Sequence, residues 1–225
     1  MRSPEAKTLV QCDFDGTITE EDVSFMLLDT FADGDWRRLL GDYRQGKISV
    51  GRFNAEAFAM IKADRQSLLG AIKDKVEIRA GFRELAAYCR GRGLRFVIVS
   101  NGLDFYIKAI LSDINVDNIE VFAAETRFPP QGLQVQYIGP DGSYLDDKFK
   151  EAYVDFFLSG GYRVIYVGNG VSDILPARRC HHLFATGDLL ASCRKMKLDC
   201  SAFVDFNDIV SGLQSLLQDI KGHNA

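Results

Sequence analysis

The sequence lacks the cysteine patterns of a disulfide-bonded or zinc-binding protein. Its 225 residues include five cysteines, an odd number, with no CxxC pair and no cysteine–histidine spacing typical of a zinc site. Small secreted domains that depend on disulfides are much richer in cysteine. We therefore expect reduced and mostly buried thiols. The five are Cys12, Cys89, Cys180, Cys193 and Cys200.

The sequence also lacks a basic stripe and a long apolar run. The net charge is −4 and the lysines and arginines are scattered, so no surface suited to a row of nucleic-acid phosphates is expected. No stretch approaches the roughly 18 apolar residues of a membrane span, and the opening MRSPEAKTLVQCDFDG has no apolar signal core. These features predict a cytoplasmic protein, monomeric or homodimeric, that binds neither nucleic acid nor membrane.

The apolar residues that are present predict a parallel sheet. Runs such as LRFVIVS and YRVIYVG are nearly continuous in apolar residues, as strands covered on both faces require. Short strand-like runs alternate with helical ones, which favours a doubly wound α/β fold. A further run at Leu133–Ile138 alternates polar and apolar residues before a Gly-Pro-Asp-Gly turn and predicts a hairpin. The expected buried strands are Thr8–Cys12, Leu94–Val99, Val121–Ala124, Arg163–Val167 and His182–Ala185.

A long helical region separates the first two expected strands. Residues 19–92 carry apolar side chains at helical spacing and no strand signal, with Ser49 and Asp64 placed as N-caps. One crossover helix needs only about a dozen residues, so the excess must form something else. We predict a small helical cap domain at 19–92, inserted into a core domain formed by 1–18 and 93–225.

Two carboxylates follow the first strand at the point where ligands bind in such sheets. Asp13 and Asp15, one residue apart in CDFDGT, end at a glycine turn and would project into the crevice beyond the strand ends. Such a pair can divide phosphoryl transfer, with Asp13 as nucleophile and Asp15 as proton donor and acceptor. The alternatives are a solvated turn or a calcium loop, but a calcium loop needs more oxygen ligands than DFDGT provides.

The order of the motifs resembles the haloacid dehalogenase superfamily in its phosphatase branch. DFDGT resembles the family's nucleophile motif, VIVSNG at 97–102 its second motif, and GNGVSD at 168–173 the acidic loop usually written GDGxxD. The resemblance implies that the Ser100 hydroxyl, with Asn101 and Gly102, holds phosphate oxygens. Taken alone, Ser100 could equally cap a helix that starts at Asp104.

The same resemblance implies a lysine that neutralises charge on the nucleophile and the phosphate. The candidates are Lys148 and Lys150 in DDKFKEAYVDFF. We favour Lys150, because Tyr153 and Val154 then place apolar side chains one turn away, as a helix packed on the sheet demands. The other lysine would be solvated.

One residue departs from the family pattern. Asn169 stands where the family normally has an aspartate that binds Mg²⁺. An amide oxygen in place of a carboxylate should weaken magnesium binding without removing a ligand atom. By resemblance, Asp13 and the backbone carbonyl of Asp15 remain ligands, and Asp173 holds a metal-bound water or substitutes as a ligand. GNG could also be only a tight turn.

The predicted helical cap indicates the class of substrate. A helical cap between the first two motifs resembles the branch that contains phosphoserine phosphatases and a methionine-salvage phosphatase, and implies a small phosphorylated metabolite. Asp22 and Arg52, with Phe25 and Phe53, are candidates for contact with the leaving group. The segment DFDGTITEED looks closer to the methionine-salvage type. The alternatives are a catalytically silent phosphate-ligand binding protein and a phosphotransferase to an alcohol acceptor.

Overall fold

An eight-stranded, mostly parallel sheet forms the centre of the computed structural model, which describes residues 7–222. The strands lie in the order β5-β4-β3-β2-β1-β6-β7-β8. They are β1 (Lys7–Cys12), β2 (Arg95–Leu103), β3 (Glu120–Arg127), β4 (Gln134–Ile138), β5 (Tyr144–Leu145), β6 (Tyr162–Gly168), β7 (His182–Ala185) and β8 (Ser201–Ala202). The helices are α1 (Val23–Phe31), α2 (Trp36–Arg44), α3 (Val50–Phe58), α4 (Arg65–Ile72), α5 (Phe82–Arg92), α6 (Asp104–Asp113), α7 (Phe149–Ser159), α8 (Ile174–Ala177), α9 (Gly187–Met196) and α10 (Phe206–Gly222), with a 3-10 turn at Val171–Asp173.

All five buried strands expected from the sequence are present and pair in parallel. β1 is central, pairing with β2 on one side and with β6 on the other. The expected hairpin is also confirmed, since β4 runs antiparallel to β3 and β5 antiparallel to β4. The sequence did not predict β8, which is only two residues long and gives no periodic signal.

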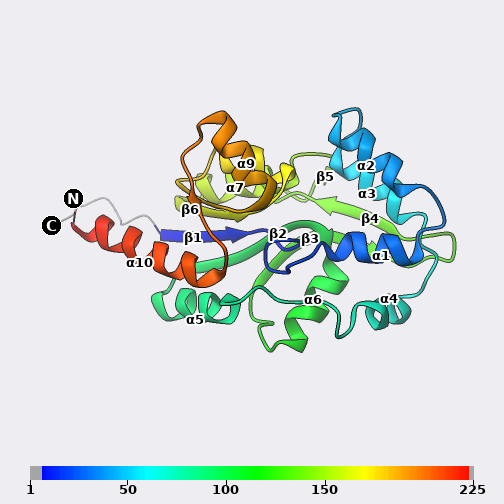
Figure 1. Cartoon of the computed structure of the whole chain (residues 1–225), viewed down its shortest axis with the longest axis horizontal. Helices are drawn as coiled ribbons and strands as arrows, with labels where there is room; N and C mark the ends of the chain where they lie inside the picture. Colours follow the sequence, from blue (N-terminus) through cyan, green and yellow to red (C-terminus); the bar gives the residue numbers. More distant parts are fainter. Residues whose placement is uncertain (1–6, 223–225) are drawn as a thin grey trace.

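Helices cover both faces of the sheet, which explains the continuous apolar runs. In Figure 1, α5, α6 and α10 lie on one face and α7 and α9 on the other. The inward residues of β1, β2 and β6 are fully or almost fully buried. Aromatic contacts join the layers, such as Phe82 of α5 and Phe96 of β2, whose ring centroids lie 6.1 Å apart. The doubly wound α/β prediction is therefore confirmed.

Helices α1–α4 gather beyond the carboxyl end of β1 (Figure 1). Ser49 and Asp64 are N-caps as expected, accepting hydrogen bonds from the backbone N–H groups of Arg52 and Ser67. Helix α5, however, packs against β2 and α10. The predicted cap segment 19–92 thus includes one helix of the sheet layer, because the chain must cross back along the sheet before entering β2.

The hairpin ties these helices to the sheet. The backbone N–H of Gly51 on α3 donates to the carbonyl of Asp146, 2.9 Å away, and the N–H of Leu133 donates to the carbonyl of Ile61, also 2.9 Å away. Backbone hydrogen bonds therefore hold one side of the cap to the β4–β5 excursion. Across residues 7–222, no helix combines the length and apolarity needed to cross a membrane.

Candidate active site

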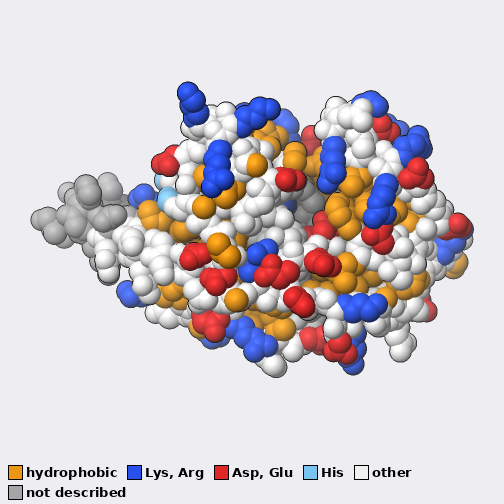
Figure 2. All heavy atoms as spheres, in the orientation of Figure 1, with side chains coloured by type: hydrophobic (Ala, Val, Ile, Leu, Met, Phe, Trp, Pro, Cys, Tyr) orange, Lys and Arg blue, Asp and Glu red, His pale blue; other side chains and the backbone are white. Residues whose placement is uncertain are grey.

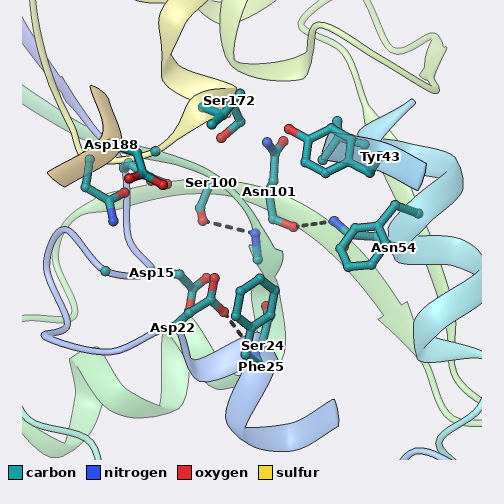
Figure 3. Close-up of a pocket in the computed structure, with 18 of the residues that line it drawn as sticks. Asp15, Asp22, Ser24, Phe25, Tyr43, Asn54, Ser100, Asn101, Ser172 and Asp188 are labelled. Atoms are coloured by element: carbon teal, nitrogen blue, oxygen red, sulfur yellow. Dashed lines mark hydrogen bonds between the residues drawn. The ribbon is translucent and has the colours of Figure 1, made fainter. Parts of the chain in front are cut away.

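A cavity of about 320 Å³ lies where the ends of β1, β2 and β6 meet the cap helices. Figure 2 shows the molecule hollowed between α9 and α2, with acidic side chains near the opening. In Figure 3, Asp15, Ser100 and Asn101 face Tyr43 and Asn54 of the cap across the hollow. Beyond Val99 the pairing of β2 with β3 shifts register, so Ser100–Gly102 form an irregular strand end. Such irregularities commonly redirect side chains at functional sites.

Lys150 is the lysine in the cavity. Its Nζ lies 2.8 Å from Oδ1 of Asp13, 2.7 Å from Oδ1 of Asp173 and 3.2 Å from Oγ of Ser172. It is the second residue of α7 and is buried, whereas Lys148 is exposed with a left-handed φ of 57°. Burial lowers the pKa of Lys150, but the two carboxylates raise it more, so the pKa is raised overall. Lys150 is therefore a permanent cation.

Asp13 lies at the tip of β1, almost wholly buried. Its backbone N–H donates to the carbonyl of Val167, which fixes the residue between β1 and β6. Burial, helped by the nearby Asp173 carboxylate and opposed by Lys150, raises the pKa of Asp13 to about 7. The carboxylate can therefore ionise near neutral pH with one cation as its partner.

Asp15 is held at both oxygens. Oδ1 accepts from the backbone N–H of Val23, 2.9 Å away at the start of α1, and Oδ2 accepts from the hydroxyl of Tyr106, 2.6 Å away on α6. Burial and the neighbouring Asp22 raise the pKa of Asp15 to about 8, although these two hydrogen bonds oppose the rise. A carboxyl group with this pKa is mostly protonated at neutral pH and can give up a proton.

Ser100 does not cap the following helix. Helix α6 begins at Asp104, and its N-cap residue is Leu103, whose side chain makes no capping hydrogen bond. Instead, Oγ of Ser100 accepts from the N–H of Gly102, 3.0 Å away, and the side chain lines the cavity. The carbonyl of the intervening Asn101 accepts from Asn54 Nδ2 at 3.0 Å and from the hydroxyl of Tyr137 at 2.5 Å. This carbonyl joins α3 of the cap and the β4 hairpin to the strand that carries Ser100.

Asp173 departs from its expected place as a metal ligand. It is fully buried and does not line the cavity. Its Oδ1 accepts from Lys150 and from the hydroxyl of Tyr166, and its Oδ2 accepts from the N–H groups of Asn169 and Gly170. Four donors occupy its oxygens, so Asp173 braces the 168–173 loop and orients Lys150.

The remaining oxygens suit a weakly held Mg²⁺. Asn169 lines the cavity with Asp13, and its Oδ1 accepts a hydrogen bond from the Thr17 hydroxyl, 3.1 Å away. Between residues 7 and 222, no group of three or more His, Cys, Asp or Glu side chains is arranged to hold a metal. Carboxylate, amide and carbonyl oxygens nevertheless form the hard donor set that Mg²⁺ accepts, with water filling other positions. The donor chemistry fits the ion, with one carboxylate fewer than the family pattern.

The cap lines the far side of the cavity with a largely apolar wall and a few charges. Asp22 lines the cavity as expected and is also the N-cap of α1, accepting from the N–H of Phe25 at 3.0 Å. Burial raises its pKa to about 6. The apolar wall comprises Phe25, Leu40, Tyr43, Val50 and Phe53.

Arg52 does not reach the cavity. Its guanidinium is largely exposed and pairs with Glu56 one turn along α3, 2.7 Å away. Of the two charged candidates for contact with the leaving group, the structure therefore brings Asp22 to the cavity and not Arg52, because the helix turns position 52 to solvent. Arg44, at the end of α2, is the arginine that lines the cavity, together with the acids Glu20 and Asp188. None of these three has a motif that identifies it in the sequence.

Comparisons with known proteins agree with this geometry. A family model described as haloacid dehalogenase-like hydrolase matches residues 10–178. The chain is 25% identical over 218 residues to a 2-hydroxy-3-keto-5-methylthiopentenyl-1-phosphate phosphatase of Brevibacillus brevis, covering 95% of this chain and 98% of that protein. It is 29% identical over 214 residues to Pdp3-interacting factor 1 of Schizosaccharomyces pombe, covering 91% and 93%.

The fold has solved counterparts. A phosphoserine phosphatase structure with an analogue of the phospho-aspartyl intermediate superposes with a TM-score of 0.69 at 19% identity, covering 92% of this chain and 99% of that one. At this identity the likeness concerns the fold. The family model spans more than half of the chain, and the curated relatives above include a named phosphatase. The chain therefore belongs to the haloacid dehalogenase-like hydrolase family.

Proposed function

We propose that the protein hydrolyses a small phosphate monoester through an aspartyl-phosphate intermediate on Asp13, with Mg²⁺ as cofactor. The observation that carries the proposal is the convergence of Asp13, Asp15, Ser100 and Lys150 on one cavity. They come from three separate segments of the chain. Asp13, Ser100 and Lys150 are almost fully buried, and burial of polar and charged groups costs free energy that functional sites commonly carry.

In the first step an oxygen of Asp13 attacks the phosphorus atom. The bond between phosphorus and the ester oxygen breaks, and the leaving oxygen takes the proton of Asp15. Lys150 keeps Asp13 ionised and offsets its repulsion of the phosphate dianion, while Ser100 and the N–H groups after it hold phosphate oxygens. The raised pKa of Asp15 supports its role as the acid.

In the second step water attacks the phosphorus of the aspartyl phosphate. Its proton passes to Asp15, now ionised, and the bond between phosphorus and Asp13 breaks to release inorganic phosphate. Both protonation states of Asp15 are used in one cycle, so the residue must be held in one place throughout.

Mg²⁺ would be held by the Asp13 carboxylate, the backbone carbonyl of Asp15 and the amide oxygen of Asn169. When bound, it supplies positive charge that stabilises the transferring phosphoryl group. Because the ligand at position 169 is a neutral amide in place of a carboxylate, the enzyme should need more Mg²⁺ than a relative with aspartate there.

The substrate is small and carries an apolar or mixed leaving group. A cavity of about 320 Å³ lies at the small end of ligand sites, and its cap wall combines aromatic and aliphatic side chains with polar ones. The relatives named as 2-hydroxy-3-keto-5-methylthiopentenyl-1-phosphate phosphatases support a methionine-salvage-type substrate. Arg52 lies outside the cavity and cannot bind the carboxylate of a substrate such as phosphoserine, which also favours a substrate of the methionine-salvage type.

The decisive experiment measures magnesium-dependent release of phosphate from 4-nitrophenyl phosphate by the wild type and by Asp13→Asn. We expect the asparagine variant to lose essentially all turnover while keeping its fold by circular dichroism. A panel of phosphorylated metabolites at low and high Mg²⁺ then identifies the substrate. Equal rates in wild type and variant would disprove the proposal.

A second candidate is a catalytically silent phosphate-ligand binding protein. Asn169 is the observation in its favour, since it removes one carboxylate from the magnesium site. On this reading the wild type shows no turnover at any Mg²⁺ concentration, and Asn169→Asp creates it.

A further inference from the structure

A tyrosine that does not touch the cavity holds the expected acid of the reaction. The Tyr106 hydroxyl donates to Oδ2 of Asp15 across 2.6 Å. Tyr106 is completely buried, lies on α6 and is absent from the cavity lining. Its hydroxyl therefore reaches the site only through side chains that it contacts, Asp15 and Ser24, both of which line the cavity.

The hydroxyl itself is fixed by the cap. Oγ of Ser24, on α1, lies 2.8 Å from the Tyr106 oxygen, and the two hydroxyls share a hydrogen bond. The residue before it, Val23, donates its backbone N–H to the other oxygen of Asp15. One carboxyl group is thus held by a core helix on one side and by the first turn of a cap helix on the other.

Gly102 shows how tightly this arrangement is packed. A Cβ atom at this position would overlap both the Tyr106 hydroxyl and Oδ2 of Asp15. Gly102 has no left-handed φ, so its backbone does not explain the glycine. The strand end that carries Ser100 therefore lies against the Tyr106–Asp15 hydrogen bond, and only glycine leaves room for it.

We infer that Tyr106 is a positioning residue that holds the Asp15 carboxyl group in place for proton transfer to the leaving oxygen. The inference rests on the proposed phosphatase function. Asp15 has single bonds about which its carboxyl group can rotate, and two directional donors fix that rotation. Without the hydroxyl, one oxygen loses its partner and the acid spends less time aimed at the substrate.

A purely structural tyrosine would behave differently. If the hydroxyl only satisfied a polar group in the core, its loss would lower stability and affect every substrate alike. If it positions the acid, its loss matters most where the leaving oxygen needs a proton. Phenyl phosphate releases a phenol with a pKa of about 10, like that of a tyrosine side chain. The nitro group of 4-nitrophenyl phosphate makes the leaving oxygen much less basic, so this ester depends little on an acid.

The test compares kcat/KM for these two esters in the wild type, Tyr106→Phe and Tyr153→Phe. The parameter kcat/KM reports the steps through the first phosphoryl transfer, where the leaving group departs. Tyr153 is the matched control, because its hydroxyl donates to the carbonyl of Ile138, 3.1 Å away and outside the cavity. We expect Tyr106→Phe to lower kcat/KM about tenfold for phenyl phosphate and less than about threefold for the nitrophenyl ester. The control should change neither by more than about twofold.

Ser24→Ala provides a second variant that keeps the tyrosine. It should shift the ratio of the two kcat/KM values in the same direction but by less, because Tyr106 can still donate. An unchanged ratio in both variants, or an equal loss on both esters, would overturn the inference while leaving the phosphatase proposal intact. Absence of Asp13-dependent turnover in the wild type would instead overturn the phosphatase proposal.

Discussion

The Lys150 ammonium lies 2.8 Å from Oδ1 of Asp13, and both side chains are almost entirely shielded from water. Lys150 also contacts Asp173 at 2.7 Å, so a single cation balances two buried acids. Buried charges are costly, and such a group survives because each member is paired. In the proposed mechanism this burial has a use, since it strengthens the field that would act on a transferring phosphoryl group.

Removing this cation should damage both stability and activity. Lys150→Met leaves Asp13 and Asp173 without their shared partner, and breaking a buried pair typically costs about 3–5 kcal/mol. We expect a loss of this order in the free energy of unfolding by urea denaturation, and loss of turnover. Lys148→Met is the matched control, because that lysine is exposed and should change neither quantity measurably. Similar stabilities for the two variants would contradict the role of Lys150.

The raised pKa values of Asp13 and Asp15 predict how stability depends on pH. Their pKa values, about 7 and about 8, lie above the 3.8 of an ordinary aspartate. Between pH 4 and 8 these two carboxyl groups therefore hold more protons in the folded protein than in the unfolded chain, so their contribution favours unfolding as the pH rises. The free energy of unfolding should fall as the pH rises from about 5 to about 8, measured with EDTA to remove metal.

Substitution should identify the source of this slope. Asp15→Asn removes one titrating carboxyl group at nearly constant shape and should flatten the fall in stability. Asp117→Asn, at an exposed position, should leave it unchanged. If the free energy of unfolding of the wild type rises with pH, or if its dependence on pH is the same in Asp15→Asn, these acids are not buried as described.

Restoring the family's acid should strengthen magnesium binding. In Asn169→Asp, a carboxylate replaces the amide oxygen beside Asp13, and ligand charge strongly tunes the affinity for divalent cations. We expect Mg²⁺ to bind roughly tenfold more tightly or better, measured by calorimetry and by the magnesium-induced rise in Tm. Asn118→Asp adds the same charge at an exposed position and should have no effect. Unchanged affinity would remove Asn169 from the set of ligands.

The sequence was most informative where function depends on the ends of strands. Asp13, Ser100 and the 168–173 loop each follow a continuous apolar run, and parallel pairing brings the ends of β1, β2 and β6 together whatever the surroundings. Lys150 was favoured over Lys148 from the apolar side chains one turn further on, and the structure makes Lys150 a buried residue of α7 and Lys148 the exposed residue before it. These predictions needed only local pattern and the topology of the sheet.

Residues whose role depends on packing between distant segments were missed. Tyr106 lies 91 residues from Asp15 in the sequence, and Tyr137 lies 36 residues from Asn101. In the sequence each looks like an ordinary core aromatic, because only the folded cap and hairpin show which groups their hydroxyls contact. Asp173 was placed on the metal because its motif does not reveal that four donors already occupy its oxygens. The wrong prediction for Arg52 has the same origin, since the facing of a cap helix depends on what it packs against.

Substitution of the two cap arginines tests which of them contacts the substrate. Arg44 lines the cavity, whereas Arg52 pairs with Glu56 on the solvent side of α3. Arg44→Gln should raise KM for the best metabolite of the phosphate panel about threefold to tenfold with little change in kcat, because a rim cation contributes binding that is similar in ground and transition states. Arg52→Gln should leave both parameters within about twofold, because an exposed pair on one helix contributes less than about 0.5 kcal/mol. The reverse outcome would mean that α3 turns its other face toward the substrate when the cap closes.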